Sequence, residues 1–434
     1  MPILNQSLSR ALPKACDVVV VGGGVVGVAA ALTLAERGQS VLLCEKGRIA
    51  CEQSSRNWGW IRQLGRDPKE LPLMQKSLQL WRAWSQRTEV DIGFREHGIT
   101  YLAETESELI RRAQWLDIAG PYADSASILD AVATDKLLGR SDRKFYGAVR
   151  MPDDARAEPT LAVPALAALA ERHGATLREG VAVRALLRKA GTVCGVATDA
   201  GPVRANAVIL AGGIWSRVLL ENEGVSFPQL AVRASVMRTA PAPSIGPGAF
   251  GSEGASLRPR LDGGYTIARA GAAHLDLVPA ALRYLPKFVP LIRDNWRILS
   301  LSAGRSFFGP LGHRRWEADE PSPFEAVRCM SPDPDVALLS EALATARWRF
   351  PSLANVPVVE RWAGLIDTMP DECPVIDHVP GLPGLVVASG FSGHGFGIGP
   401  GGGAMAADLA TGTRPAVDPA PFRYARYANL SPLN

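Results

Sequence analysis

The sequence predicts an α/β fold in which a Rossmann-type, dinucleotide-binding domain is interleaved with a second α+β domain built on a mostly antiparallel sheet. Three observations predict it. A glycine-rich strand–helix–strand unit opens the chain, similar buried strands recur near 205–211 and 385–388, and the segments between them mix short strands, helices and loops. We therefore expect a dinucleotide-binding domain from 15–61, 150–225 and 352–434, and a substrate domain from 62–149 and 226–351.

The first unit of the chain is predicted to be a strand, a helix and a second strand. An apolar, β-branched strand at 17–21 leads into a helix at 25–37, and a second apolar strand follows at 40–44. Gly22, Gly24 and Gly27 form the pattern G-x-G-x-x-G between the first strand and the helix. The first glycine permits the tight turn, the second lets the backbone approach a pyrophosphate, and the third lets helix and strand pack closely. The helix N-terminus at Val25 and Val26 then points free N–H groups at the phosphates.

An acidic residue ends the second strand. Glu45 lies 21 residues after Gly24, where a carboxylate accepts hydrogen bonds from ribose hydroxyls and repels a 2′-phosphate. A second match to the glycine pattern, at Gly397, Gly399 and Gly402, lacks a following strand–helix–strand unit. We therefore expect one dinucleotide, other than NADP, and electrons that come from the substrate rather than from a nicotinamide.

The remaining elements follow from hydrophobic periodicity and from glycine and proline punctuation. Helical spacing is expected at 71–88, 106–116, 159–173, 279–298 and 341–350. Strands are expected at 94–103, 175–179, 181–189, 193–198, 205–211, 232–239, 265–269 and 385–388. After the last strand we expect a glycine-rich loop and then a helix that runs through 402–411.

Bulk composition excludes several classes of function. The 434 residues carry a net charge of +4 with no block of lysine and arginine, so we expect no nucleic-acid partner. Six cysteines form no C-x-x-C pair, which predicts reduced thiols and no metal site. The sequence shows no signal peptide and no transmembrane run, so we expect a cytoplasmic protein and leave peripheral membrane contact open.

Four segments together carry a resemblance to a known family. They are the unit from Gly22 to Glu45, the stretch EQSSRNWGW at 52–60, the strand AVILAGGIWS at 207–216, and a C-terminal group. That last group comprises RWAGL at 361–365, PD at 370–371, PVI at 374–376 and GFSGHGFGIGP at 390–400. The chain resembles the D-amino-acid oxidase-like FAD-dependent oxidoreductases, a family that includes glycine oxidase, sarcosine oxidase and D-amino acid dehydrogenase.

The resemblance implies FAD as the cofactor and assigns its neighbours. Glu45 and Lys46 are expected at the adenosine ribose, and Val183 at the adenine. The pyrophosphate and isoalloxazine are expected against Ser54, Ser55, Arg56, Asn57, Trp58, Gly59 and Trp60, and the adenosine side against Ala211, Gly212 and Trp215. The pyrimidine edge is expected beside the loop of Gly393, His394, Gly395, Phe396, Gly397 and Ile398, with Gly364 also near the cofactor. The glycines let backbone N–H groups approach the negative N1–O2 edge of reduced flavin, and the helix after Pro400 directs its positive end there.

One position departs from the family. Glycine oxidase and D-amino acid dehydrogenase commonly carry an arginine after Ala-Gly-Leu, and that arginine clamps the substrate carboxylate. Here Ile366 and Asp367 follow Leu365. Either another base such as Arg62, Arg305 or Arg269 holds a carboxylate, or the substrate lacks one and Asp367 meets a cationic amine.

The expected reaction is oxidation of a C–N bond of an amine or amino acid by hydride transfer to flavin N5, giving an imine that hydrolyses. His394 would orient the substrate or tune the flavin, and Tyr265 lies on a strand expected to cover it. FAD is expected to be non-covalent, with Cys373 and His394 the outside candidates for attachment. The alternatives are C–O oxidation of a 2-hydroxy acid and a flavin-binding subunit of a larger complex. Oxygen or a quinone or other electron-transfer acceptor would take the electrons.

Overall fold

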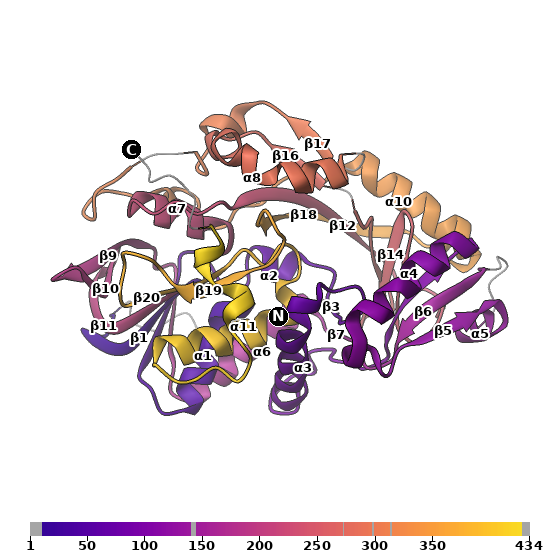
Figure 1. The fold of residues 1–434 in the computed structure, drawn as a ribbon, viewed down its shortest axis with the longest axis horizontal. Coiled ribbons are helices and arrows are strands. Elements are labelled where there is room, and N and C mark those ends of the chain that lie inside the picture. The colour runs from indigo at the N-terminus through magenta and orange to yellow at the C-terminus, as the bar shows by residue number, and fades with distance from the viewer. Residues whose placement is uncertain (1–10, 140–144, 272, 297–298, 313–314, 428–434) are drawn as a thin grey trace.

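The computed structural model describes residues 11–139, 145–271, 273–296, 299–312 and 315–427, and Figure 1 shows their fold. Two large sheets organise the chain, and a small ladder joins β3 (Trp60–Ile61) to β7 (Ala155–Arg156). Helices α1, α3, α6 and α11 gather beside the first sheet in Figure 1. No helix within the described ranges is both long and apolar enough to cross a bilayer.

The first sheet has a parallel core. Its path is β19 (Val375–His378), β20 (Leu385–Ser389), β11 (Gly201–Leu210), β1 (Ala15–Val21), β2 (Val41–Glu45) and β8 (Thr176–Glu179), and β10 (Thr192–Thr198) and β9 (Val183–Lys189) extend from β11. Strand β1 pairs in parallel with both β11 and β2, and α1 (Val25–Glu36) connects β1 to β2. The predicted strand–helix–strand unit is therefore confirmed.

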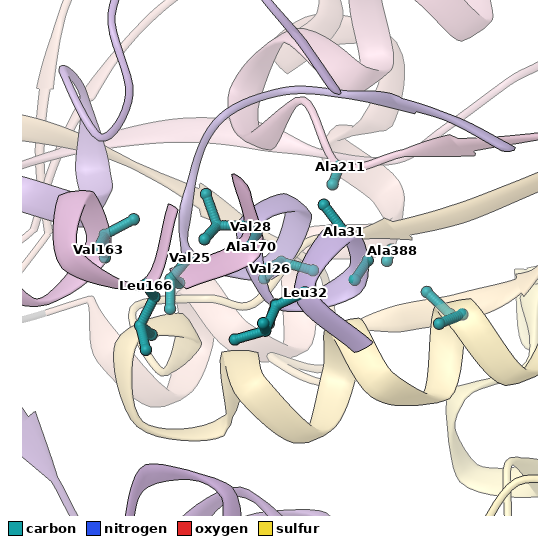
Figure 2. Packing of buried hydrophobic residues seen from close by; sticks show 14 of the residues in the cluster. Val25, Val26, Val28, Ala31, Leu32, Val163, Leu166, Ala170, Ala211 and Ala388 are labelled. Carbon is teal, nitrogen blue, oxygen red and sulfur yellow. The ribbon is translucent and has the colours of Figure 1, made fainter. Parts of the chain in front are cut away.

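Helix α1 is buried on every side, from Val25 to Ala35. It packs against α6 (Pro159–Arg172) and α11 (Gly395–Ala410), as Figure 2 shows for Val25 and Leu32 beside Val163 and Leu166. A helix with so few polar side chains is stable only when it is covered all round, which explains why segments far apart in sequence meet here.

The second sheet is mostly antiparallel, as predicted. Its path is β17 (Leu299–Ser302), β16 (Ala273–Asp276), β12 (Leu230–Thr239), β15 (Tyr265–Ala268), β14 (Ala255–Pro259), β13 (Ala249–Ser252), β4 (Ile99–Ala103), β6 (Gly147–Met151) and β5 (Ser127–Asp130), with β18 (Val358–Thr368) also on β12. The pairs β13–β4 and β16–β17 are parallel. The second domain also holds α4 (Glu106–Ala119), α5 (Ala131–Leu137), α8 (Pro279–Asn295) and α10 (Val336–Arg349), whereas α3 (Leu71–Ser85) packs against α11 beside the first sheet.

One strand belongs to a different sheet from the one that the predicted domain boundaries imply. Strand β18 pairs along its length with β12 of the second sheet, although 352–434 was assigned to the dinucleotide-binding domain. An apolar strand has the same alternation in either sheet, so the sequence pattern does not choose its partner. The other boundaries stay a prediction.

The glycine-rich segment after β20 is a helix rather than the predicted loop. Helix α11 begins at Gly395 and ends at Ala410. A Cβ on Gly403 would lie 2.4 Å from the carbonyl oxygen of Val26, and one on Gly401 would lie 2.7 Å from that of Leu73. Glycine is unfavourable in an isolated helix, but here it allows close packing against α1 and α3, and this packing outweighs propensity.

Two side chains of α3 repair the break that Pro400 makes in α11. A proline lacks the N–H and disturbs the helical hydrogen bonds around it. Ser77 Oγ donates to the carbonyl of Ile398 at 2.8 Å and accepts from the N–H of Gly401 at 2.7 Å. Trp81 Nε1 donates to the carbonyl of Gly397 at 3.1 Å. Helix α11 therefore keeps its direction because α3 satisfies its backbone.

Candidate active site

A cavity of about 450 Å³ lies at the carboxyl ends of the parallel strands. Val21, Cys44, Leu210 and Ala388, which end or nearly end β1, β2, β11 and β20, line it. Ligands of open α/β sheets bind at this edge. Many predicted cofactor residues line the cavity: Gly22, Gly24, Val25, Val26, Glu45, Lys46, Ser54, Arg56, Asn57, Trp58, Trp60, Val183, Ala211, Gly212, Trp215, Gly364, Gly393, His394, Gly395 and Phe396.

The glycine turn has the geometry expected of a pyrophosphate cradle. Gly22 has φ of 110°, and a Cβ there would lie 2.4 Å from the carbonyl oxygen of Ala211. A Cβ on Gly27 would lie 2.0 Å from the carbonyl oxygen of Gly22, so this glycine serves helix–strand packing. Ser54 Oγ accepts the N–H of Val25 at 2.9 Å and so faces the start of α1. The turn is shaped for a close ligand.

Two backbone hydrogen bonds fix the position of the Glu45 carboxylate. Its Oε2 accepts from the N–H of Gly23 at 2.7 Å and its Oε1 from that of Gly47 at 2.7 Å. Burial raises the pKa of Glu45 above its usual range, and these two donors and Lys46 oppose the shift. Each carboxylate oxygen has a further lone pair for a ribose hydroxyl, as the predicted role requires.

Lys46, Glu52 and Trp215 form one polar group beside Glu45. Lys46 Nζ lies 2.8 Å from Glu52 Oε1 and 4.3 Å from the centroid of the Trp215 ring. Trp215 Nε1 donates to Glu52 Oε2 at 2.9 Å. This contact agrees with the prediction that Lys46 and Trp215 border the same end of a ligand. No role for Glu52 was predicted from the sequence.

Five predicted cofactor residues do not line the cavity, namely Gly27, Ser55, Gly59, Gly397 and Ile398. Gly59 has φ of 78°, and a Cβ there would lie 2.4 Å from the carbonyl oxygen of Ala157. Gly397 and Ile398 belong to the part of α11 that packs on α3. These positions are important for packing behind the cavity, which a motif match cannot separate from ligand contact.

The start of α11 faces the cavity. Gly393, His394, Gly395 and Phe396 line it, and α11 begins at Gly395. The first N–H groups of a helix have no partner within it, and they carry the positive end of its dipole. The prediction of backbone N–H groups and a positive helix end beside an anionic ring edge therefore fits, with the helix beginning before Pro400 rather than after it.

His394 is half-buried beside an acid and two arginines. Its Nδ1 lies 3.0 Å from Glu70 Oε2, at ion-pair distance but without hydrogen-bond geometry. Burial, and then Arg66, lowers the pKa of His394 to about 4. Burial alone would raise the pKa of Glu70, but His394, Arg66 and Arg62 outweigh it and leave that pKa below its usual range. Near neutral pH the histidine is uncharged.

Asp367 lines the cavity and also holds a turn, and its expected contact with a cationic amine stays a prediction. Its Oδ2 accepts from the N–H groups of Gly390 at 2.8 Å and Phe391 at 3.3 Å. It is 2% exposed, and burial raises its pKa to about 6. A carboxylate already bound by the backbone after β20 holds that turn in place at the cavity wall.

Four arginines line the cavity, and the first of them, Arg56, donates to the carbonyl of Ala363 at 3.1 Å. Arg62 donates to the carbonyl of Leu64, and Arg66 is buried with its Nη1 3.9 Å from Glu70 Oε2. Arg269, in the turn after β15, pairs with Glu341, whose side chain is 64% exposed. The cavity is therefore cationic without an arginine at position 366.

One predicted catalytic residue, Tyr265, does not join this group. Tyr265 is 2% exposed within the core of the second sheet, and its hydroxyl accepts from the N–H of Ile245 at 2.9 Å. It does not line the cavity, because its strand turns that side chain toward the core. Arg305 begins a short 3-10 turn, and its side chain lies outside the described residues.

Sequence reasoning missed Arg66, Glu52 and Gln53. Arg66 lies in the stretch RDP directly after Gly65, and nothing in its spacing marks it as buried. Gln53 lines the cavity, and its Nε2 is buried without a hydrogen-bond partner among the described residues. An unpaired buried amide is costly, so this group suits a ligand that accepts a hydrogen bond.

The glycine cradle, the ribose acid and the positive helix end together fit a flavin dinucleotide. This arrangement defines a flavin-dependent oxidoreductase. A family model described as FAD-dependent oxidoreductase, the DAO family, matches residues 17–409, and the chain belongs to that family. The predictions of fold class, of FAD and of an oxidoreductase are thereby confirmed.

Individual relatives cover nearly the whole chain. Glycine oxidase from Pseudomonas aeruginosa is 28% identical over 93% of this chain and 97% of its own length. L-Amino acid deaminase from Proteus myxofaciens, solved with anthranilate, is 32% identical with a TM-score of 0.90, covering 96% of this chain and 94% of that one. L-Amino acid deaminase from Proteus vulgaris is 29% identical with a TM-score of 0.88, covering 95% and 97%.

Proposed function

We propose that this flavoenzyme oxidises the C–N bond of an α-amino acid, giving an imine that hydrolyses to an oxo acid and ammonia. The observation that carries the proposal is the cationic wall of the cavity, formed by Arg56, Arg62, Arg66 and Arg269. Such a wall suits a substrate with a carboxylate better than a simple amine. The glycine oxidase and L-amino acid deaminase relatives support the same class.

Arg269 is the arginine best placed to take the substrate carboxylate. Arg56 and Arg62 each donate to a backbone carbonyl, and Arg66 is buried beside Glu70. The partner of Arg269, Glu341, is exposed, and an exposed ion pair contributes only about 0–1 kcal/mol. A substrate carboxylate can therefore replace Glu341 at little cost, which none of the other three arginines allows.

The chain's own residues position the chemistry. FAD, when bound, accepts the hydride equivalent that leaves the carbon. Glu45 and the turn at Gly22–Gly24 hold the dinucleotide, and the start of α11 faces its anionic edge. His394 is uncharged at neutral pH, so it contributes orientation rather than charge. Oxygen or a quinone then takes the electrons.

Anaerobic bleaching of the bound flavin tests the proposal. We expect amino acids to bleach it, and the corresponding amino-acid amides to require at least 100-fold higher concentrations. Bleaching by 2-hydroxy acids but not amino acids would establish C–O oxidation instead. If no amine, amino acid or hydroxy acid bleached the flavin, a flavin-binding subunit would be the better description. Recolouring in air identifies an oxidase, and recolouring only with a quinone identifies a dehydrogenase.

The substitution Arg269→Gln tests the carboxylate anchor. Loss of a charged hydrogen-bonded pair costs roughly 3 kcal/mol, or about 100-fold, and we expect it in KM for the amino acid with kcat little changed. The matched control is Arg238→Gln, which removes an arginine of the same sheet that also pairs with exposed acids but does not line the cavity. An equal KM in the two variants would exclude Arg269 as the anchor.

A further inference from the structure

A short segment crosses one end of the cavity. It comprises residues 322–330, including α9 (Pro323–Ala326), and we call it the strap. Lys46 Nζ donates to the strap carbonyls of Val327 at 2.8 Å and Arg328 at 3.0 Å. The N–H of Met330 donates to Glu52 Oε1 at 2.9 Å. The strap therefore fastens onto residues that line the end expected to hold ADP.

The strap is also anchored on the far side of that end. Arg328 Nη1 donates to the carbonyls of Lys46 at 3.1 Å and Gly180 at 3.0 Å, and its Nη2 reaches Asp199 at 2.5 Å. Glu325 accepts from Arg184 at 2.8 and 2.7 Å. Because Arg184 follows Val183, the strap joins the two sides of the cavity at the predicted adenine position.

The strap approaches the backbone at Gly47 closely, and only glycine allows this approach. A Cβ there would lie 2.2 Å from the carbonyl oxygen of Arg328 and 3.0 Å from Cys51 Sγ. No side chain fits in that space. Phe324 of the strap lines the cavity and meets the Trp215 ring edge-on, with centroids 5.8 Å apart. FAD seated at Glu45 and Lys46 would lie under the strap, so the strap must lift for its ADP half to leave.

Two free thiols meet at this junction. Cys329 Sγ lies 3.2 Å from the carbonyl oxygen of Cys51, and Cys51 Sγ lies 3.9 Å from that of Arg328. These reciprocal contacts place the thiols side by side, within hydrogen-bonding reach of each other. Cys329 is exposed, whereas Cys51 is half-buried and lines the cavity.

We propose that Cys51 and Cys329 form a reversible disulfide that fastens the strap over the ADP end of the cavity and slows the exchange of FAD. A small-molecule disulfide such as oxidised glutathione is the oxidant. The Cys329 thiolate attacks one of its sulfurs and releases one reduced glutathione. The Cys51 thiol then loses its proton and attacks the Cys329 sulfur, which releases the second glutathione and leaves the protein disulfide.

The order of attack follows from the surroundings of the two thiols. Burial raises the pKa of the Cys51 thiol to about 12, so little thiolate forms there first. The exposed Cys329 meets the oxidant, and Cys51 then has its partner sulfur beside it. The disulfide closes a covalent link between residues 278 positions apart, so no rotation of the strap alone can release it.

The experiment compares the purified holoenzyme after treatment with oxidised glutathione and after treatment with dithiothreitol. We expect oxidation to remove two thiols by Ellman titration, to lower the intact mass by about 2 Da, and to yield a peptide that joins Cys51 to Cys329. We expect FAD release on dilution, followed by flavin fluorescence, to be at least tenfold slower from the oxidised protein. These readouts do not depend on any substrate, so a failure of the proposed amino-acid chemistry leaves them interpretable.

Matched variants complete the test. Cys329→Ser removes the exposed thiol and should abolish both the disulfide and the redox dependence of FAD release, while Cys194→Ser, on β10 away from the strap, should keep both. Gly47→Ala should speed FAD release in either redox state, because its methyl group displaces the Arg328 carbonyl. A glutathione adduct without an internal disulfide, or an internal disulfide that leaves FAD release unchanged, would overturn the proposal.

Discussion

The contact between α11 and α1 predicts how Gly403→Ala changes the free energy of unfolding, through two effects of opposite sign. Gly403→Ala adds one methyl group in the interior of α11. In a solvated helix this change stabilises by about 1 kcal/mol, because alanine is the better helix former. Here the new Cβ would lie 2.4 Å from the Val26 carbonyl oxygen and 2.7 Å from Ala29 Cβ and the Ala30 nitrogen.

We expect the steric clash to outweigh the gain in helix propensity. The atoms that the methyl group meets are mainly backbone, and α1 is buried on every side, so no flexible side chain can move away. Overpacking of this type costs about 1–3 kcal/mol, occasionally more. With the helix-propensity gain subtracted, we expect Gly403→Ala to lower the free energy of unfolding by up to about 2 kcal/mol.

Urea unfolding of the apoprotein, with the midpoint read by tryptophan fluorescence, measures the effect without a contribution from FAD. The matched control is Gly397→Ala in the same helix, where the nearest atoms to the new Cβ are Met74 Sδ and the Trp60 carbonyl oxygen, each at an ordinary 3.5 Å. We expect the control to be as stable as the wild type or up to about 1 kcal/mol more stable, because only the gain in helix propensity remains there. A Gly403→Ala protein as stable as Gly397→Ala would refute the packing argument for the glycines of α11.

Two further predictions concern polar groups at the same helix and turn. Ser77→Ala leaves the Ile398 carbonyl and the Gly401 N–H buried without their partner, which should destabilise the protein by about 2–4 kcal/mol, whereas Ser77→Thr, which keeps the hydroxyl, should recover part of that loss in the same urea assay. Asp367 has a folded-state pKa raised to about 6 from an ordinary 3.8, so the folded protein binds the proton more tightly and stability should fall as pH rises between about 4 and 6, by at most about 3 kcal/mol. Asp367→Asn should flatten that fall in apoprotein unfolding curves, and an unchanged pH dependence would show that Asp367 does not titrate there.

Sequence and structure agree wherever the decisive contacts are local. The turn at Gly22, the start of α1 and the position of Glu45 all lie within one strand–helix–strand unit, and the glycine spacing and the strand end specify them. The arrangement of two sheets whose segments alternate along the chain could also be predicted, because glycine and proline residues mark the ends of strands regardless of which sheet those strands join.

Other features depend on residues that are distant in sequence. The pattern of β18 does not say that it pairs with β12, and the sequence predicts the end of α11 at 402–411 but suggests a loop for its start, where α1 and α3 fill the space of the missing side chains. The second role of Asp367, in holding the turn after β20, was not predicted because that turn is 23 to 24 residues further along the chain.

By itself, then, the sequence determined the dinucleotide cradle, the family and the alternation of elements, since these depend on short-range sterics and hydrogen bonding. Only the tertiary structure decided which charged groups meet: His394 beside Glu70, four arginines around one cavity, and a strap whose thiol lies against Cys51. Burial and long-range contact set those charges and distances, and neither is encoded in the spacing of residues along the chain.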